Sequence, residues 1–164
     1  MAVPVITIVG QSGSGKTRFM ESLIAELKRR GYRIGTLKHH SHPGFEIDQA
    51  GKDSWRHARA GSHHVVVAAP DKIAAYRLLE RELCLDEILP QFDDVDLVLV
   101  EGYREAGKPS IEIVRGAHRE DLISPVERLL ALITEKVFDL RVPQFKPGDL
   151  LPLADRIEAR FLKR

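Results

Sequence analysis

The stretch that decides the fold of this chain is Gly10-Gln11-Ser12-Gly13-Ser14-Gly15-Lys16-Thr17. It matches the phosphate-binding loop pattern, in which a glycine and any four residues are followed by Gly-Lys and then Ser or Thr. The motif requires a strand before it and a helix after it. Both are predicted here, because residues 5–9 form an apolar, β-branched run and residues 18–24 begin a helical pattern.

Each residue type in this stretch has a chemical role. Glycines let successive backbone N–H groups point at phosphate oxygens, and the following helix adds the positive end of its dipole. Lys16 is expected to reach the outer phosphates as a catalytic residue, and the Thr17 hydroxyl to ligate Mg²⁺. The predicted nucleotide-binding residues are Gly10, Gln11, Ser12, Gly13, Ser14, Gly15, Lys16 and Thr17. The alternative is a Gly- and Ser-rich turn with only a capping role, which the strand–loop–helix context disfavours.

Hydrophobic periodicity predicts an α/β fold around the loop. We expect a buried strand at 3–9, a helix with one apolar face at 15–30 and a second strand at 32–38. A strand, helix and strand within about 30 residues imply a right-handed crossover and a parallel pair. Further strands are expected at 95–101 and 129–134. We therefore predict a three-layer phosphate-loop NTPase domain with helices on both faces of the sheet.

Two weaker patterns concern the rest of the sheet. Residues 63–69 and 72–78 are β-rich and are joined by the short turn Pro70-Asp71, which predicts a hairpin. We therefore expect a mixed, mostly parallel sheet. Residues 110–115 alternate weakly and are expected to form an edge strand. Exposed strand edges of this kind offer a rationale for a homodimer.

Composition limits the classes of function. The 164 residues suit a single domain, residues 1–164, and the formal net charge of +1 gives no reason to expect nucleic acid or an anionic membrane as partner. One cysteine, Cys84, excludes an intrachain disulfide, so we expect a reducing, cytoplasmic location. Neither a signal peptide nor an apolar run of about 18 residues is apparent, so we expect no membrane span.

The carboxyl ends of the strands indicate further site residues, because ligands of open α/β sheets bind there. Glu101 ends an apolar strand, where phosphate-loop enzymes place a second acidic group near Mg²⁺. We predict Glu101 as a metal and catalytic residue that contacts the metal through water or orients the attacking water. The alternative is a solvated glutamate at a strand end. Lys38, His39 and His40 end the second strand and are predicted to contact phosphate or substrate.

Asp48 is the third predicted metal residue. It begins Asp48-Gln49-Ala50-Gly51, which matches the Asp-x-x-Gly motif of GTP-hydrolysing switch proteins; the alternative is an ordinary turn aspartate.

Six of the seven histidines fall between residues 39 and 64, which raises the question of zinc. The spacing of His39, His40 and His42 matches no common structural zinc pattern. We therefore favour contact of His39 and His40 with phosphate or substrate over a zinc site.

The residues alone do not show which nucleotide base the site binds. Guanine-specific switch proteins carry Asn-Lys-x-Asp after a late strand, whereas this chain has Thr134-Glu135-Lys136-Val137, so GTP and ATP stay open. Fast phosphoryl transfer on this fold usually needs a lid of arginines over the phosphates. The candidates are scattered along the chain, which favours slow hydrolysis: Arg56, Arg59, Arg104 and Arg119.

Five segments occur in an order that resembles a known family, the molybdopterin-guanine dinucleotide biosynthesis protein B family. They cover essentially the whole chain: the loop at 10–17, Thr36-Leu37-Lys38-His39-His40, residues 48–61, Asp96-Leu97-Val98-Leu99-Val100-Glu101-Gly102-Tyr103 and residues 108–115. The resemblance implies a GTP-binding adapter with weak Mg²⁺-dependent GTPase activity in molybdenum cofactor maturation. It further implies a homodimer and, as partner, the enzyme that attaches GMP to molybdopterin.

Two other functions are considered beside this one. A small-molecule kinase or other phosphoryl-transfer enzyme that uses ATP is the alternative on the same phosphate-loop fold. A nucleic-acid-binding ATPase is disfavoured by the near-neutral charge.

Overall fold

The computed structural model describes residues 3–115 and 122–162, and within these ranges the chain divides into two compact units. The core unit consists of Met1–His39 and Cys84–Arg164, and the insert unit of His40–Leu83. That a single domain covers residues 1–164 stays a prediction.

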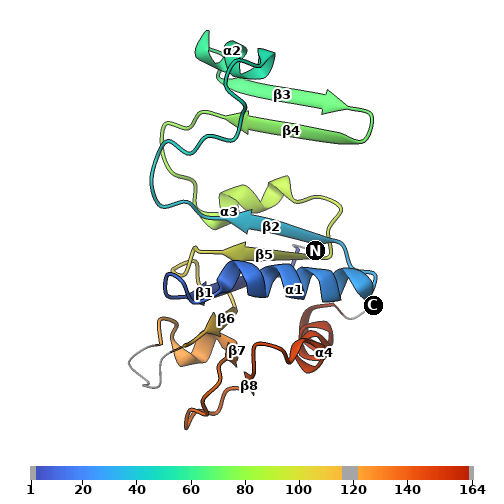
Figure 1. The fold of residues 1–164 in the computed structure, drawn as a ribbon, viewed down its shortest axis with the longest axis vertical. Coiled ribbons are helices and arrows are strands. Elements are labelled where there is room, and N and C mark those ends of the chain that lie inside the picture. Colours follow the sequence, from blue (N-terminus) through green and yellow to red (C-terminus); the bar gives the residue numbers. More distant parts are fainter. Residues whose placement is uncertain (1–2, 116–121, 163–164) are drawn as a thin grey trace. The chain divides into compact units, whose positions relative to one another are not determined.

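The core unit is built on a sheet, called the central sheet below. In the described residues this sheet has six strands in the order β2-β5-β1-β6-β7-β8, and every neighbouring pair is parallel (Figure 1). The strands are β1 (Val5–Gly10), β2 (Ile34–Lys38), β5 (Leu97–Glu101), β6 (Ser110–Ile113), β7 (Leu129–Ile133) and β8 (Gln144–Phe145). Parallel pairing brings the carboxyl ends of distant segments to one edge, and this edge carries the candidate site.

Helices cover both faces of the central sheet. Helices α1 (Lys16–Arg29) and α4 (Leu150–Phe161) pack with alternate residues of β1, namely Ile6 and Ile8, in one apolar cluster. Helix α3 (Leu85–Ile88) and the 3-10 helix η1 (Leu89–Gln91) pack on the opposite face, where Val5 lies with Leu85. A further 3-10 helix, η3 (Val126–Arg128), precedes β7. Both faces of the strands are therefore apolar, and the predicted three-layer fold is confirmed.

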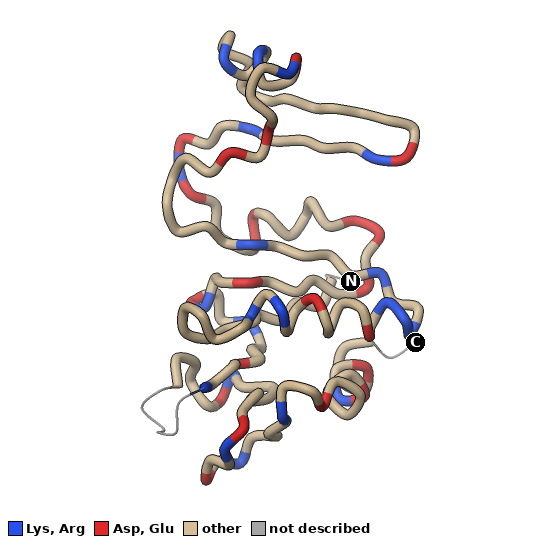
Figure 2. The backbone as a smooth tube through the Cα atoms, viewed as in Figure 1, with Lys and Arg blue, Asp and Glu red and all other residues tan. Residues whose placement is uncertain are grey.

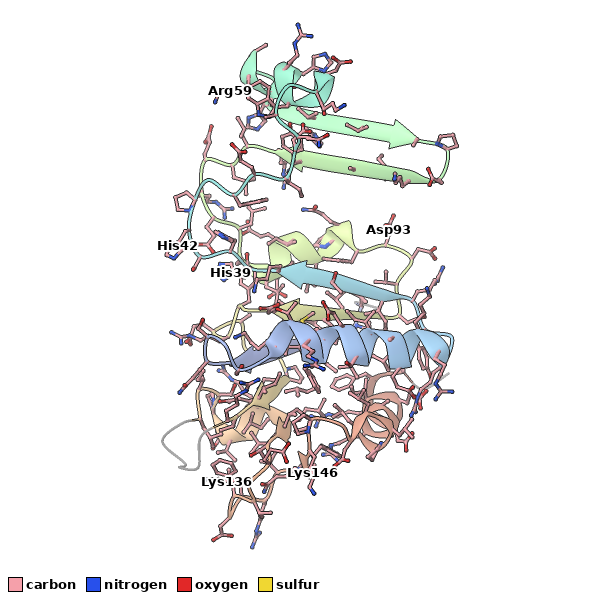
Figure 3. All side chains as sticks on the ribbon, viewed as in Figure 1. His39, His42, Arg59, Asp93, Lys136 and Lys146 are labelled. Carbon is pink, nitrogen blue, oxygen red and sulfur yellow. The ribbon has the colours of Figure 1, made fainter. Side chains whose placement is uncertain are left out.

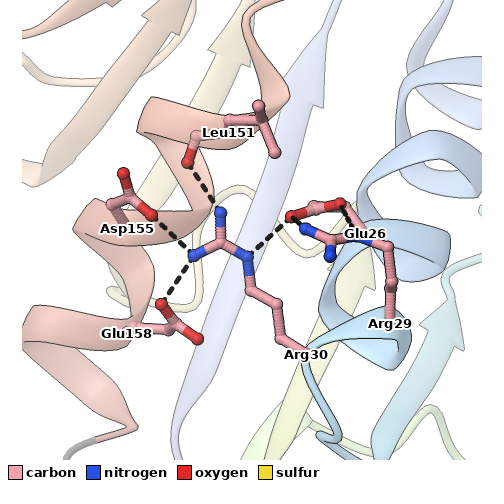
Figure 4. A network of polar contacts seen from close by, with 6 residues as sticks. All are labelled: Glu26, Arg29, Arg30, Leu151, Asp155 and Glu158. Carbon is pink, nitrogen blue, oxygen red and sulfur yellow. Dashed lines mark hydrogen bonds and ion pairs between the residues drawn. The ribbon is translucent and has the colours of Figure 1, made fainter.

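Arg30, just after α1, ties that helix to α4 (Figure 4). Its side chain is 14% exposed and contacts Asp155 and Glu158 of α4 at 2.6 Å each. It also donates to Glu26 of α1 at 2.7 Å and to the carbonyl oxygen of Leu151 at 3.1 Å. The guanidinium thus meets three carboxylates, so the two helices on this face are joined by charge as well as by apolar packing.

The insert unit contains helix α2 (Asp53–Arg59) and the strands β3 (His64–Ala69) and β4 (Lys72–Arg77). The predicted hairpin is confirmed, because β3 and β4 pair antiparallel. It forms a separate sheet, however, so the expected mixed sheet is corrected to a central sheet with only parallel pairs among its described strands. The reason is that a short turn specifies which strands pair with each other and not which sheet they join. Val66 and Ile73 of the hairpin are exposed, unlike every residue of β5, β6 and β7.

One further strand prediction is corrected, and one strand was not predicted. Residues 110–115 were expected at an edge, but β6 lies between β1 and β7 and its four residues are buried. The weak alternation misled because Ser110 and Glu112 are polar residues in a buried strand. Strand β8 has only two residues, too few to produce a periodic signal in the sequence.

Basic and acidic residues of the described chain are not separated into large regions of one charge (Figure 2). Figure 2 shows basic and acidic residues interspersed along the backbone of each unit. In the part of the chain that the structure describes, no helix has the length and apolar character needed to cross a membrane.

Candidate functional site

The phosphate-binding loop connects β1 to α1 at the carboxyl edge of the central sheet. Gly10 and Gly15 both have positive φ, +156° and +95°. A Cβ on Gly10 would lie 2.7 Å from the carbonyl oxygen of Ile113 and equally close to the Ser14 hydroxyl. Only glycine therefore fits at the end of β1, where the chain must turn while packed against β6.

Lys16, the first residue of α1, lies against this loop. Its ammonium donates to the carbonyl oxygens of Gly10 at 2.9 Å and Gln11 at 2.8 Å. Both acceptors belong to the loop, so the Lys16 ammonium lies against the loop backbone, and its contact with an outer phosphate stays a prediction.

Glu101 meets two of the other predicted residues. It ends β5, pairs in register with Lys38 of β2, and its side chain is 9% exposed. One carboxylate oxygen accepts a hydrogen bond from the Thr17 hydroxyl at 3.4 Å, and the other forms an ion pair with the Lys38 ammonium. The structure thus brings together Thr17, Lys38 and Glu101 from α1, β2 and β5.

His39 lies beside this group, at the end of β2 (Figure 3). Its backbone N–H donates to the carbonyl oxygen of Glu101 at 2.8 Å, and its ring lies against that of Tyr103, with 4.3 Å between centroids and a tilt of 36°. Gly102 and Tyr103 both have positive φ, +102° and +49°, which is uncommon for a tyrosine. The chain after β5 therefore turns sharply under the His39 ring, and His39 forms part of the rim of the site.

His40 belongs to the insert unit. Its Nδ1 lies 2.8 Å from the carbonyl oxygen of His42, and its ring is 6.0 Å from that of Phe45. Within the described residues no group of three or more His, Cys, Asp or Glu side chains is arranged to hold a metal ion. Phosphate or substrate contact by His39 and His40 stays a prediction.

Asp48 also belongs to the insert unit, and both of its carboxylate oxygens accept hydrogen bonds there. One accepts from the Ser54 hydroxyl at 3.0 Å and the other from the Tyr76 hydroxyl at 2.8 Å. The bond from Tyr76, followed by those from Gln49 and Ser54, lowers the pKa of the Asp48 carboxyl despite its partial desolvation. A metal role stays a prediction, and the carboxylate oxygen that accepts from Tyr76 keeps a second lone pair for a ligand.

The described arginines considered as a lid belong to two units, the insert unit and the core unit. Arg56 and Arg59 lie on α2 of the insert unit, where Arg59 lies over the Trp55 ring at 5.4 Å. Arg104 pairs with its neighbour Glu105 at 3.3 Å, in the core unit. Arg119 lies outside the described residues.

Arg115 is a residue of the site that the sequence analysis missed. It follows β6, and its Nε donates to the carbonyl oxygen of Ser14 in the phosphate-binding loop at 3.0 Å. One Nη of the same guanidinium lies 3.1 Å from the position that a Cβ on Gly15 would take. A cavity of about 100 Å³ opens here, lined by residues 11–14 and 113–115. The signal that could have identified Arg115 is its place at the carboxyl end of the strand predicted at 110–115.

The family model, two curated relatives and a crystal structure point to the same family. The model of the family described as "Molybdopterin guanine dinucleotide synthesis protein B" matches residues 5–135. The molybdopterin-guanine dinucleotide biosynthesis adapter protein of Haemophilus influenzae is 36% identical, over 95% of this chain and 88% of the relative. The protein of the same description in Escherichia coli is 30% identical, over 93% of this chain and 90% of the relative. The crystal structure of Bacillus subtilis MobB superposes with a TM-score of 0.77 at 28% identity, covering 98% of this chain and 99% of that one.

Proposed function

The chain belongs to the molybdopterin guanine dinucleotide synthesis protein B family, and on that premise we propose that it is a GTP-binding adapter for the attachment of GMP to molybdopterin. The observation that supports a nucleotide role most strongly is the convergence of Lys16, Thr17 and Glu101 at one edge of the central sheet. The relatives named adapter proteins favour this function over the kinase alternative.

In this proposal, residues 10–17 hold the phosphates. The backbone N–H groups of the loop and the N-terminus of α1 bind phosphate oxygens, and the Lys16 ammonium leaves the loop carbonyls for the outer phosphates. Lys38 adds a second positive charge close to Glu101. The proposed preference for GTP over ATP rests on the family alone, because the chain lacks the Asn-Lys-x-Asp motif.

The residues present fit a magnesium ion. The Thr17 hydroxyl and the Glu101 carboxylate are hard oxygen donors that already lie within hydrogen-bond distance of each other. Thr17 and Glu101 would hold the ion, and the chemistry that it would supply is positive charge to offset that of the phosphates. Glu101, held by Thr17 and Lys38, is positioned to orient a water at the same place. Asp48 is retained as a further proposed metal contact.

We propose that any hydrolysis is slow. Of the arginines considered as a lid, Arg59 lies over the Trp55 ring and Arg104 pairs with Glu105, and both contacts favour slow turnover. Slow turnover suits an adapter, because the bound nucleotide then sets how long a binding state persists.

The proposed partners are the GMP-transferring enzyme and a second copy of this chain. In the described residues β2 is an outer strand of the central sheet, and the hairpin leaves the outer edges of β3 and β4 unpaired. Such edges are available for pairing with another chain. The single cysteine supports the proposal of a cytoplasmic location.

Calorimetric titration of GTP and of ATP, each with Mg²⁺, tests the nucleotide proposal. We expect binding of GTP that Lys16→Ala abolishes without loss of the folded state.

The adapter role is tested by capture of the GMP-transferring enzyme with the purified chain in the presence of GTP. Rapid phosphoryl transfer to a small molecule, or equal affinity for ATP and GTP, would contradict the proposal. A monomeric mass by light scattering at micromolar concentration would contradict the homodimer.

A further inference from the structure

We propose that Arg115 is a nucleotide-binding residue whose guanidinium contacts the α-phosphate, at the inner end of the bound phosphate chain. This inference rests on the proposed function, since it assumes that residues 10–17 bind a nucleoside di- or triphosphate. It assigns to the site a positively charged residue outside the motif.

The position of Arg115 follows from the register of the sheet. Gly10 pairs with Ile113 across β1 and β6, so Arg115 emerges two residues beyond the point where β1 enters the loop. Its Nε–H is bound to the Ser14 carbonyl oxygen, which fixes the guanidinium plane against the loop. Gly15 accommodates that plane because it has no side chain.

The anchored guanidinium keeps donors for a ligand. An arginine has five N–H groups in a rigid fork, and the bond to Ser14 uses only the Nε–H. Among the described residues no carboxylate lies within ion-pair distance of Arg115, whereas Lys38 is paired with Glu101. A guanidinium that no described carboxylate pairs with, beside a phosphate-binding loop, is suited to bidentate contact with phosphate oxygens.

The side of the loop on which Arg115 lies indicates which phosphate it meets. Strand β1 lies between β5 and β6, with Glu101 on the β5 side and Arg115 on the β6 side. Thr17 and Glu101 mark the β5 side as the end for the metal and the outer phosphates. The β6 side is then left for the inner end of the phosphate chain.

The surroundings of Arg115 also indicate room for a polar group. Ser14 is 6% exposed, and its hydroxyl has no hydrogen-bond partner among the described residues. Both residues line the same cavity of about 100 Å³. A buried hydroxyl usually has a partner, so a ligand oxygen or a water that accompanies it would complete the site.

The assignment predicts a specific pattern of affinities. GDP and GTP share the α-phosphate, so loss of Arg115 should weaken both by the same factor, about tenfold for one charged contact. Loss of Lys38, which lies on the side of the outer phosphates, should weaken GTP more than GDP. A residue that only stabilised the folded loop would instead change the unfolding temperature of the nucleotide-free protein.

The experiment measures the Kd of GDP and of GTP, both with Mg²⁺, for the full chain and the variants Arg115→Gln, Arg115→Lys and Lys38→Met. Arg33→Gln serves as a matched control, because Arg33 pairs with Asp94 at the opposite end of the sheet. We expect Arg115→Gln to raise both Kd values about tenfold with their ratio unchanged, Arg115→Lys to recover part of the loss, and the control to match wild type.

Three outcomes would overturn the inference. They are unchanged Kd values for Arg115→Gln, a loss confined to GTP, and a lowered unfolding temperature of the nucleotide-free variant together with no recovery in Arg115→Lys. Failure of the wild-type chain to bind either nucleotide would instead remove the proposed function and the inference together.

Discussion

Replacement of Glu101 by glutamine provides a sensitive test of the proposed site. Glutamine has the same shape and can still accept the hydrogen bond from the Thr17 hydroxyl, but it carries no charge. The change therefore removes the ion pair with Lys38 and the negative charge available to Mg²⁺, while the packing at the end of β5 is preserved.

The expected effect on stability is small. The Lys38 side chain is 61% exposed, so water solvates its ammonium once the partner is neutral. An ion pair with one exposed member contributes at most about 1 kcal/mol. For a chain of this size that corresponds to a change in unfolding temperature of roughly 2–4 °C at most.

The expected effect on metal-dependent binding is larger. A lost interaction with a charged group is worth roughly 1.5–3 kcal/mol, which corresponds to a ten- to hundredfold change in affinity. The assay is calorimetric titration of GTP with Mg²⁺ and with a chelator. We expect wild type to bind GTP more tightly with Mg²⁺, and Glu101→Gln to lose most of that gain.

Lys38→Met is the matched control, because it breaks the same ion pair and leaves the Glu101 carboxylate in place. The variant should keep the gain in affinity that Mg²⁺ provides. If Glu101→Gln also keeps the full gain, the metal role is wrong and Glu101 is only a strand-end glutamate that pairs with a lysine.

Three further predictions concern the loop, the helix pair and the insert unit. Gly10→Ala should destabilise the folded chain by roughly 1–3 kcal/mol in denaturant unfolding, because its Cβ would meet the carbonyl oxygen of β6 at 2.7 Å; an unchanged midpoint would show that the loop can move away. Hydrogen bonds from Arg29 and Arg30 lower the pKa of Glu26 to about 2, below its ordinary 4.5, so its stabilising contribution is complete above pH 4.5 and is lost as the pH falls towards 2. Unfolding midpoints measured across that range should fall more steeply for wild type than for Glu26→Gln, and parallel curves would exclude this source of acid sensitivity. Asp48→Asn should make the insert unit more sensitive to limited proteolysis, since two hydroxyl groups donate to this carboxylate, whereas a changed Mg²⁺ dependence of GTP binding with unchanged proteolysis would favour the metal role.

Most elements of the fold could be predicted from the sequence because their signals are local. The helix expected at 15–30 is α1, and the buried strand expected at 95–101 is β5, with boundaries one or two residues away. These elements are apolar with a period of 3.6 or are apolar throughout, and these patterns are typical of a helix packed on a sheet and of a buried parallel strand. The hairpin was also visible, since a short turn joins its two strands.

What the sequence could not specify is how distant segments meet. The position of β6 inside the central sheet and the separation of the hairpin from that sheet depend on which strands find each other across the whole chain. No short-range pattern encodes that order, because the same apolar strand can pack at an edge or in the middle of a sheet.

The sequence by itself determined the phosphate-binding loop. Its eight consecutive residues include the glycines that allow the loop conformation, and the lysine and threonine expected to contact phosphate and Mg²⁺. The tertiary structure alone decided what surrounds the loop. The contact from Thr17 to Glu101 spans 84 residues and that from Ser14 to Arg115 spans 101. Such contacts exist only once parallel strands have brought their carboxyl ends to one edge. Glu101 was predicted because it ends a strongly apolar strand, whereas Arg115 was missed because the weakly alternating residues 110–115 were expected at the edge of the sheet.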